Sequence, residues 1–98
     1  MTIQETVIWF NSIYELNRKD GEPKGGFTCF LTFIVGGGLK DVDARKCLGI
    51  TKCDSTDTAE RLLASMEAEG YSIDRKEKGE GEDGIATVCL CRKEKPNN

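Results

Sequence analysis

Apolar residues recur at helical spacing through residues 3–17, and this periodicity predicts the first helix. Thr2 and, three positions later, Glu5 form the sequence pattern of a capping box at its start. The apolar positions form two adjacent stripes, which together are wider than one buried helix face requires. The stripes are Ile3, Val7, Phe10 and Tyr14, and Trp9, Ile13 and Leu16. A helix lying across a sheet accounts for such a surface; the alternative is that part of it, with Trp9 as the candidate, contacts a partner or a second copy.

Three segments have the composition and two-residue periodicity of strands, in which successive side chains point to opposite faces. They are residues 27–35, 71–78 and 85–92. The strand at 27–35 has one wholly apolar face and one half-apolar face, so we expect one side to be covered and the other partly shielded. The last two strands predict a hairpin with an acidic, glycine-rich tip at 79–84. The triple glycine at 36–38 ends the first strand, and we interpret it as a turn because no phosphate-binding motif follows it.

Two further helices are predicted between these strands. One is a short helix at 41–48, and the other begins near Ser55 and ends at Gly70, a residue type that favours helix C-termini. The predicted order is αβααββ, a small single α+β domain over residues 1–98. We expect a three-stranded, mainly antiparallel sheet with an N-terminal helix and two further helices, followed by a polar tail at 93–98.

Length and composition suit one globular domain with a modest core, since 38% of the 98 residues are hydrophobic and 32% are charged. The net charge of −3 and the pI near 5.0 provide no overall attraction to nucleic acid or to an anionic membrane. No apolar segment approaches the roughly 20 residues that span a bilayer. The N-terminus lacks the basic start and apolar run of a signal peptide, so we expect a cytoplasmic protein.

Five cysteines are many for this length, but an odd count without a secretion signal argues against a disulfide framework. Cys89 and Cys91 are the closest pair, and a zinc site would require Cys47 and Cys53 to converge on them. We favour small thiols, Cys29 included, that pack as apolar side chains. The chain has no histidine, so a thiol nucleophile lacks its usual base. We therefore predict no catalytic, cofactor-binding or metal-binding residues and no enzyme activity.

The stretch from residue 41 to residue 92 resembles the winged-helix family of DNA-binding domains. The residues that carry the resemblance are Arg61-Leu62-Leu63, Met66-Glu67-Ala68-Glu69-Gly70-Tyr71-Ser72-Ile73 and Arg75. They are similar to the end of a recognition helix that leads into a wing, and the resemblance covers about half of the chain. It implies that residues 55–69 form the recognition helix and residues 77–84 the wing tip.

The charges along this stretch favour a protein-binding variant of that family over a DNA-binding one. Residues 54–69 contain five carboxylates against Arg61 alone, whereas a helix in the major groove supplies basic side chains to phosphates and bases. The candidate partner-binding residues form an acidic face: Asp57, Glu60, Glu80, Glu82 and Asp83. The alternative candidates form a basic patch: Lys40, Arg45, Lys46 and Lys52.

The leading hypothesis is a non-enzymatic modulator or inhibitor that binds a protein partner. Small acidic proteins of this kind are frequent among phage and mobile-element accessory proteins. Such proteins often block a nucleic-acid-handling complex, as anti-CRISPR proteins do. The alternative hypothesis is a dimeric winged-helix transcriptional regulator that binds DNA through the basic patch and dimerises through its first helix.

Overall fold

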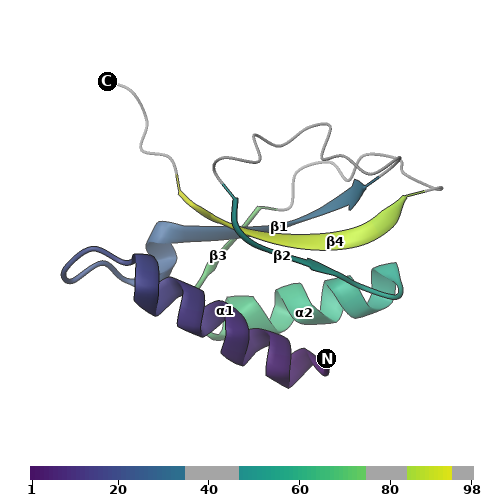
Figure 1. The fold of residues 1–98 in the computed structure, drawn as a ribbon, viewed down its shortest axis with the longest axis horizontal. Coiled ribbons are helices and arrows are strands. Elements are labelled where there is room, and N and C mark those ends of the chain that lie inside the picture. Colours follow the sequence, from purple (N-terminus) through teal and green to yellow (C-terminus); the bar gives the residue numbers. More distant parts are fainter. Residues whose placement is uncertain (35–46, 75–83, 94–98) are drawn as a thin grey trace.

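The computed structural model describes residues 1–34, 47–74 and 84–93, which contain two α-helices, a short 3₁₀-helix and one four-stranded sheet. In chain order the elements are α1 (Ile3–Asn17), η1 (Lys24–Gly26), β1 (Phe27–Ile34), β2 (Cys47–Lys52), α2 (Thr56–Ala68), β3 (Ser72–Asp74) and β4 (Ile85–Arg92). Both helices lie on the same face of the sheet, side by side (Figure 1). The predicted small α+β domain is confirmed at this level.

The strand order across the sheet is β2-β4-β1-β3, so β4 and β1 are the central strands. They pair antiparallel over their whole length, from Phe27 opposite Arg92 to Ile34 opposite Ile85. β2 pairs antiparallel with the other edge of β4, and β3 pairs parallel with β1. Parallel neighbours require a long crossover connection. Here that connection includes α2, which packs on β1, β3 and β4.

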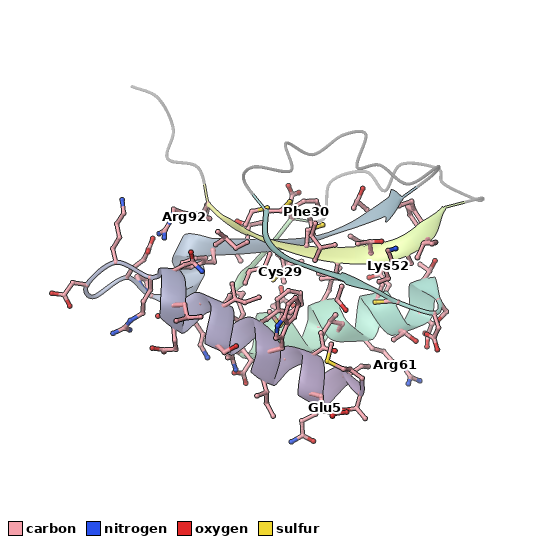
Figure 2. The ribbon with its side chains drawn as sticks, viewed as in Figure 1. Glu5, Cys29, Phe30, Lys52, Arg61 and Arg92 are labelled. Atoms are coloured by element: carbon pink, nitrogen blue, oxygen red, sulfur yellow. The ribbon has the colours of Figure 1, made fainter. Side chains whose placement is uncertain are left out.

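The core lies between the two helices and one face of the sheet. Alternate residues of each strand point to this face, and Cys29 lies on the helix side of β1 whereas Phe30 lies on the opposite side (Figure 2). The buried core consists of Phe10, Ile13, Tyr14, Phe27, Cys29, Leu31, Ala59, Leu62, Leu63, Met66, Tyr71, Ala86, Val88 and Leu90. These buried side chains come from α1, β1, α2 and β4, and from Tyr71, which directly precedes β3.

Local signals define the ends of both helices. The Thr2 hydroxyl accepts a hydrogen bond from the Glu5 amide at 3.1 Å, and the Glu5 carboxylate accepts one from the Thr2 amide at 2.9 Å, so the predicted capping box is confirmed. The Ser55 hydroxyl caps α2 by accepting from the Thr58 amide at 3.1 Å. Gly70 follows α2 with φ of 107°, a backbone conformation that favours glycine and confirms it as the C-terminal signal.

A close approach at Gly49 lets α1 pack against β2. A Cβ atom at this position would lie 2.6 Å from Cδ1 of Ile13 and 3.1 Å from Cε1 of Phe10, both of which are buried. Glycine in a strand often marks such an approach. Because Gly49 has no side chain, Phe10 and Ile13 of α1 can lie close to the backbone of β2.

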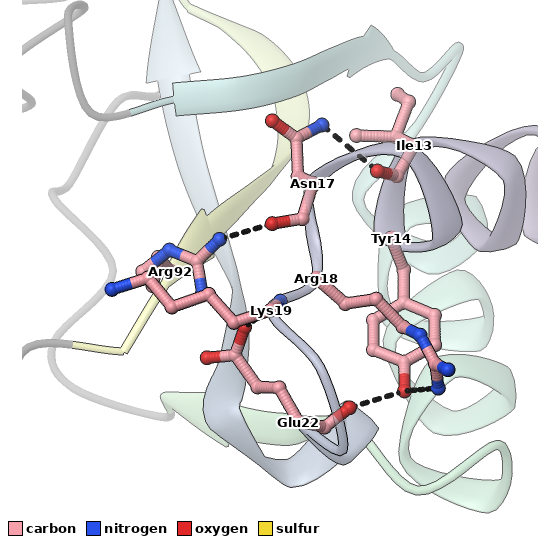
Figure 3. A network of polar contacts seen from close by, with 7 residues as sticks. All are labelled: Ile13, Tyr14, Asn17, Arg18, Lys19, Glu22 and Arg92. Atoms are coloured by element: carbon pink, nitrogen blue, oxygen red, sulfur yellow. Dashed lines mark hydrogen bonds and ion pairs between the residues drawn. The ribbon is translucent and has the colours of Figure 1, made fainter.

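A network of polar contacts connects the segment after α1 to the end of β4 (Figure 3). Arg92 donates to the Glu22 carboxylate and to the Asn17 carbonyl oxygen. The Tyr14 hydroxyl donates to the Glu22 carbonyl oxygen at 2.6 Å. These contacts hold the turn between α1 and β1 against the sheet, which in turn positions the C-terminal end of α1.

The predicted three-stranded sheet is wrong, because residues 47–52 form a strand that sequence analysis did not assign. Cys47 and Leu48 were expected at the end of a short helix, but they lie in β2, where Cys47 pairs with Cys91 of β4. The rest of that predicted helix lies outside the described residues, which contain two helices and not three. The segment has β-favouring Ile50 and Thr51, and pairing with the free edge of β4 outweighs a weak local helical pattern.

The predicted hairpin between the last two strands is also wrong in the described residues. β1 lies between β3 and β4, so these two strands are not neighbours. The physical reason is that β1 is buried and central, and its two edges take a parallel partner on one side and an antiparallel partner on the other. The predicted tip at 79–84 lies outside the described residues except for Gly84.

Candidate functional site

The exposed side of α1 carries three large apolar side chains. Ile8, Trp9 and Leu16 are 61%, 38% and 85% exposed. Residues four apart share a helix face, so Ile8, the small exposed Ser12 and Leu16 form one line along the helix, with Trp9 beside it. We call these four residues the α1 outer face. A single exposed apolar side chain is ordinary, whereas three together form a candidate contact surface.

Trp9 is the residue of this face that the sequence suggested. Its ring centroid lies 5.1 Å from that of Phe10 with the planes tilted by 41°, so the indole packs on a core residue. The Ser12 hydroxyl donates to the Trp9 carbonyl oxygen at 2.6 Å. Tryptophan that is anchored on one side and exposed on the other is typical of residues that contribute strongly to protein interfaces.

The hydrophobic pattern did not identify Ile8, and it did not separate Leu16 from its buried neighbours. The pattern placed Leu16 in one stripe with Ile13, but Ile13 is buried against β2 and Leu16 is exposed. Ile8 belongs to neither predicted stripe. Its position outside both stripes is the signal that could have identified it as a residue on the opposite side of the helix.

The helix that carries this face, α1, and its neighbour α2 are both acidic. Their bounds include five carboxylates and one basic residue, Arg61; the carboxylates are Glu5, Glu15, Asp57, Glu60 and Glu67. Figure 2 shows Glu5 and Arg61 pointing away from the sheet. The Thr2 amide, followed by the Thr2 hydroxyl, lowers the pKa of the Glu5 carboxyl below its usual value. The helix layer therefore combines exposed apolar side chains with negative charge.

The predicted acidic face is only partly within the described residues. Asp57 is exposed and forms an ion pair with Arg61 at 3.1 Å, one helical turn away. Both side chains are more than two thirds exposed, so this pair contributes little to stability. Glu60 is half-buried. The remaining residues of that predicted face, Glu80, Glu82 and Asp83, lie outside the described residues.

Lys52 is the one residue of the predicted basic patch within the described residues, since Lys40, Arg45 and Lys46 lie outside them. It is exposed at the end of β2 and lines a cavity of about 300 Å³ beside the N-termini of both helices. The full lining is Met1, Ile3, Thr6, Thr51, Lys52, Cys53, Asp54, Thr58 and Leu62. Helix N-termini attract anions, but here Thr2 and Ser55 already cap both helices.

The thiols divide into buried and half-buried groups. Cys29 and Cys89 are fully buried, as the packing interpretation predicted, and burial raises the pKa of Cys29 to about 12. Burial, and then Asp54, raises the pKa of the half-buried Cys53. Cys91 donates to Cys47 across the sheet at a sulfur–sulfur distance of 3.5 Å. Among the described residues, no group of three or more histidine, cysteine, aspartate or glutamate side chains is arranged to hold a metal ion.

Comparison of the chain with protein-family models, curated proteins and solved structures finds no match. In the part of the chain that the structure describes, neither helix has the length and apolar character needed to cross a membrane. Among the surfaces of the described residues, the α1 outer face is the most distinctive, because it exposes three large apolar side chains.

Proposed function

We propose that this protein is a non-enzymatic modulator that binds a partner protein through the α1 outer face. The observation that carries the proposal is the exposure of Ile8, Trp9 and Leu16 on a helix whose other side is firmly packed in the core. Helices of this kind bind by placing their apolar residues in a groove of the partner. The rigid sheet beneath α1 limits the conformational entropy that binding costs.

The negative charge of the two helices favours a partner with a basic surface. The five carboxylates of the two helices complement a groove rimmed by lysine and arginine. Proteins that handle nucleic acids have such basic surfaces, because they neutralise phosphates. We therefore propose an inhibitory role in which this acidic protein occupies the basic surface of a nucleic-acid-handling complex, as anti-CRISPR-like accessory proteins do.

The proposal is tested by capture of a partner from host lysate on the immobilised protein. We expect capture to be lost with Ile8→Ser and to weaken as salt is added, because both apolar contact and charge contribute. The matched control is Ile85→Ser, the same change at an isoleucine that is 46% exposed on β4. Capture that is equal for the two variants would contradict the role of the α1 outer face.

Fluorescence anisotropy of a labelled DNA duplex tests the alternative, a dimeric winged-helix regulator that uses the basic patch. We expect no binding at low salt or at near-physiological salt, because the net charge is −3 and the helices are acidic. Micromolar or tighter binding that weakens steeply with added salt would instead support the DNA-binding regulator.

A further inference from the structure

Cys47 and Cys91 lie opposite each other on neighbouring antiparallel strands. They are paired in the register of β2 and β4, and their sulfur atoms are 3.5 Å apart. Directly opposed residues of antiparallel strands have Cα atoms about 4.5 to 5.5 Å apart. This spacing falls within the range of about 4.4 to 6.8 Å that a disulfide bond spans. The register is irregular between Cys47 and Gly49, so the closest evidence for a bond is the sulfur–sulfur distance of 3.5 Å, which must shorten to about 2.05 Å when the bond forms.

A third thiol lies on the same face of the sheet but differs in its surroundings. Val88 and Leu90 point to the helices, so Cys89 and Cys91, which alternate with them, point to the other face. Cys89 is opposite Ile50 in the register and is fully buried. Burial, followed by the neighbouring Cys47 and Cys91 thiols, raises its pKa. Its reactive thiolate form is therefore scarce, whereas Cys47 and Cys91 are only half-buried.

We propose that Cys47 and Cys91 form a reversible thiol–disulfide site that responds to low-molecular-weight disulfides such as oxidised glutathione. One protein thiolate attacks the glutathione disulfide, forms a mixed disulfide and releases one glutathione thiolate. The second protein thiolate then attacks the mixed disulfide and releases the other. The protein loses two electrons and two protons, and the reagent gains them as two glutathione thiols.

The bond would covalently join the edge strand β2 to the central strand β4. It closes the long chain segment between residues 47 and 91, and closing a long loop stabilises a fold by restricting the unfolded chain. We expect the oxidised protein to melt at least about 10 °C higher than the reduced protein. This site is independent of the proposed partner contact, because the thiols lie on the face of the sheet opposite to the helices.

The experiment incubates the full chain with oxidised glutathione, quenches it in acid, blocks free thiols and analyses the tryptic peptides by mass spectrometry. We expect an intact mass lower by two hydrogens, and a cross-link between the peptide of residues 47–52 and that of residues 79–92. Fragment spectra should assign the bond to Cys91 and not to Cys89. Cys53 lies in a separate peptide and serves as an internal control that should carry no cross-link to residues 79–92.

Two variants make the assignment independent of the fragment spectra. Cys89→Ser should retain the cross-link and the rise in Tm, whereas Cys91→Ser should lose both. Mixed glutathione disulfides alone on the wild-type protein would overturn the proposal. A cross-link that persists in Cys91→Ser would also overturn it, since the bond would then join Cys47 to Cys89.

Discussion

At the scale of single residues, Gly49 is the position at which the smallest change should have a clear effect. A methyl group there meets the buried Ile13 and Phe10 side chains at 2.6 and 3.1 Å. Gly49→Ala should therefore lower the free energy of unfolding by about 1 to 3 kcal/mol, as overpacking of a core does. Urea denaturation measures the loss. Gly25→Ala is the control, because its Cβ would meet no atom closer than 3.7 Å; equal losses in both variants would contradict this account.

Glu22 should make stability depend on pH. The hydrogen bond from Arg92, followed by that from the Lys19 amide, lowers the pKa of the Glu22 carboxyl in the folded protein. A carboxyl whose pKa is lowered by folding stabilises the protein above its unfolded pKa of about 4.3, and this contribution is lost as pH falls through the folded value. Acidification therefore weakens the fold, and Glu22→Gln should make that decline shallower.

Urea denaturation between pH 7 and pH 3 checks this expectation. Glu22→Gln should be less stable than wild type at pH 7, where the ion pair is intact, and the difference should shrink at pH 3. Arg92→Gln, which removes the other partner, should also give a shallower decline. Parallel curves for wild type and both variants would show that this ion pair does not contribute to the pH dependence.

At the scale of elements, α1 has one face buried in the core and an exposed face that we propose binds a partner. Phe10 is fully buried, so Phe10→Ala should lower the free energy of unfolding by about 3 to 5 kcal/mol. Ile8→Ser on the outer face should change it by about 0.5 kcal/mol or less. Thermal or urea unfolding of the two variants measures both changes in the free energy of unfolding. A large loss for Ile8→Ser would mean that its side chain serves the fold and not a partner.

The elements with strong local signals were predictable from the sequence. The helix at 3–17 and the strand at 85–92 have the predicted bounds, because a capping box and clear periodicity define them. The strand at 47–52 was not predictable. Gly49 interrupts the pattern of β-favouring residues in the sequence, and the pairing of the strand with β4 is a tertiary contact. The place of β3 beside β1 depends on which strand edges remain free, which local patterns do not contain.

The candidate site was predictable only in part for the same reason. Periodicity identified α1 as an amphipathic helix with excess apolar surface and singled out Trp9. Which stripe would be buried depends on where β2 contacts the helix, and Gly49 sets that contact. Ile13 therefore lies in the core, while Leu16, three residues later, is exposed. Predicting that Cys47 lies opposite Cys91 would have required the register of β2 and β4, which the sequence pattern does not contain.

At the scale of the whole molecule, the fold separates two surfaces. The two helices cover one face of the sheet (Figure 1). They form an acidic layer, and the residues of the α1 outer face are exposed on it. The Cys47 and Cys91 pair lies on the other face of the sheet. Partner binding and thiol oxidation should therefore be separable, so that Ile8→Ser leaves the cross-link intact and Cys91→Ser leaves capture intact.

The most direct test of the proposed contact is photo-crosslinking from the α1 outer face. Benzoylphenylalanine is placed at Leu16, and in a second preparation at Ile85, before exposure to host lysate and light. We predict one covalent adduct from the position of Leu16, lost when Ile8→Ser is added, and no such adduct from the position of Ile85. No adduct from Leu16, or the same adduct from both positions, would contradict the claim that this face binds a protein partner.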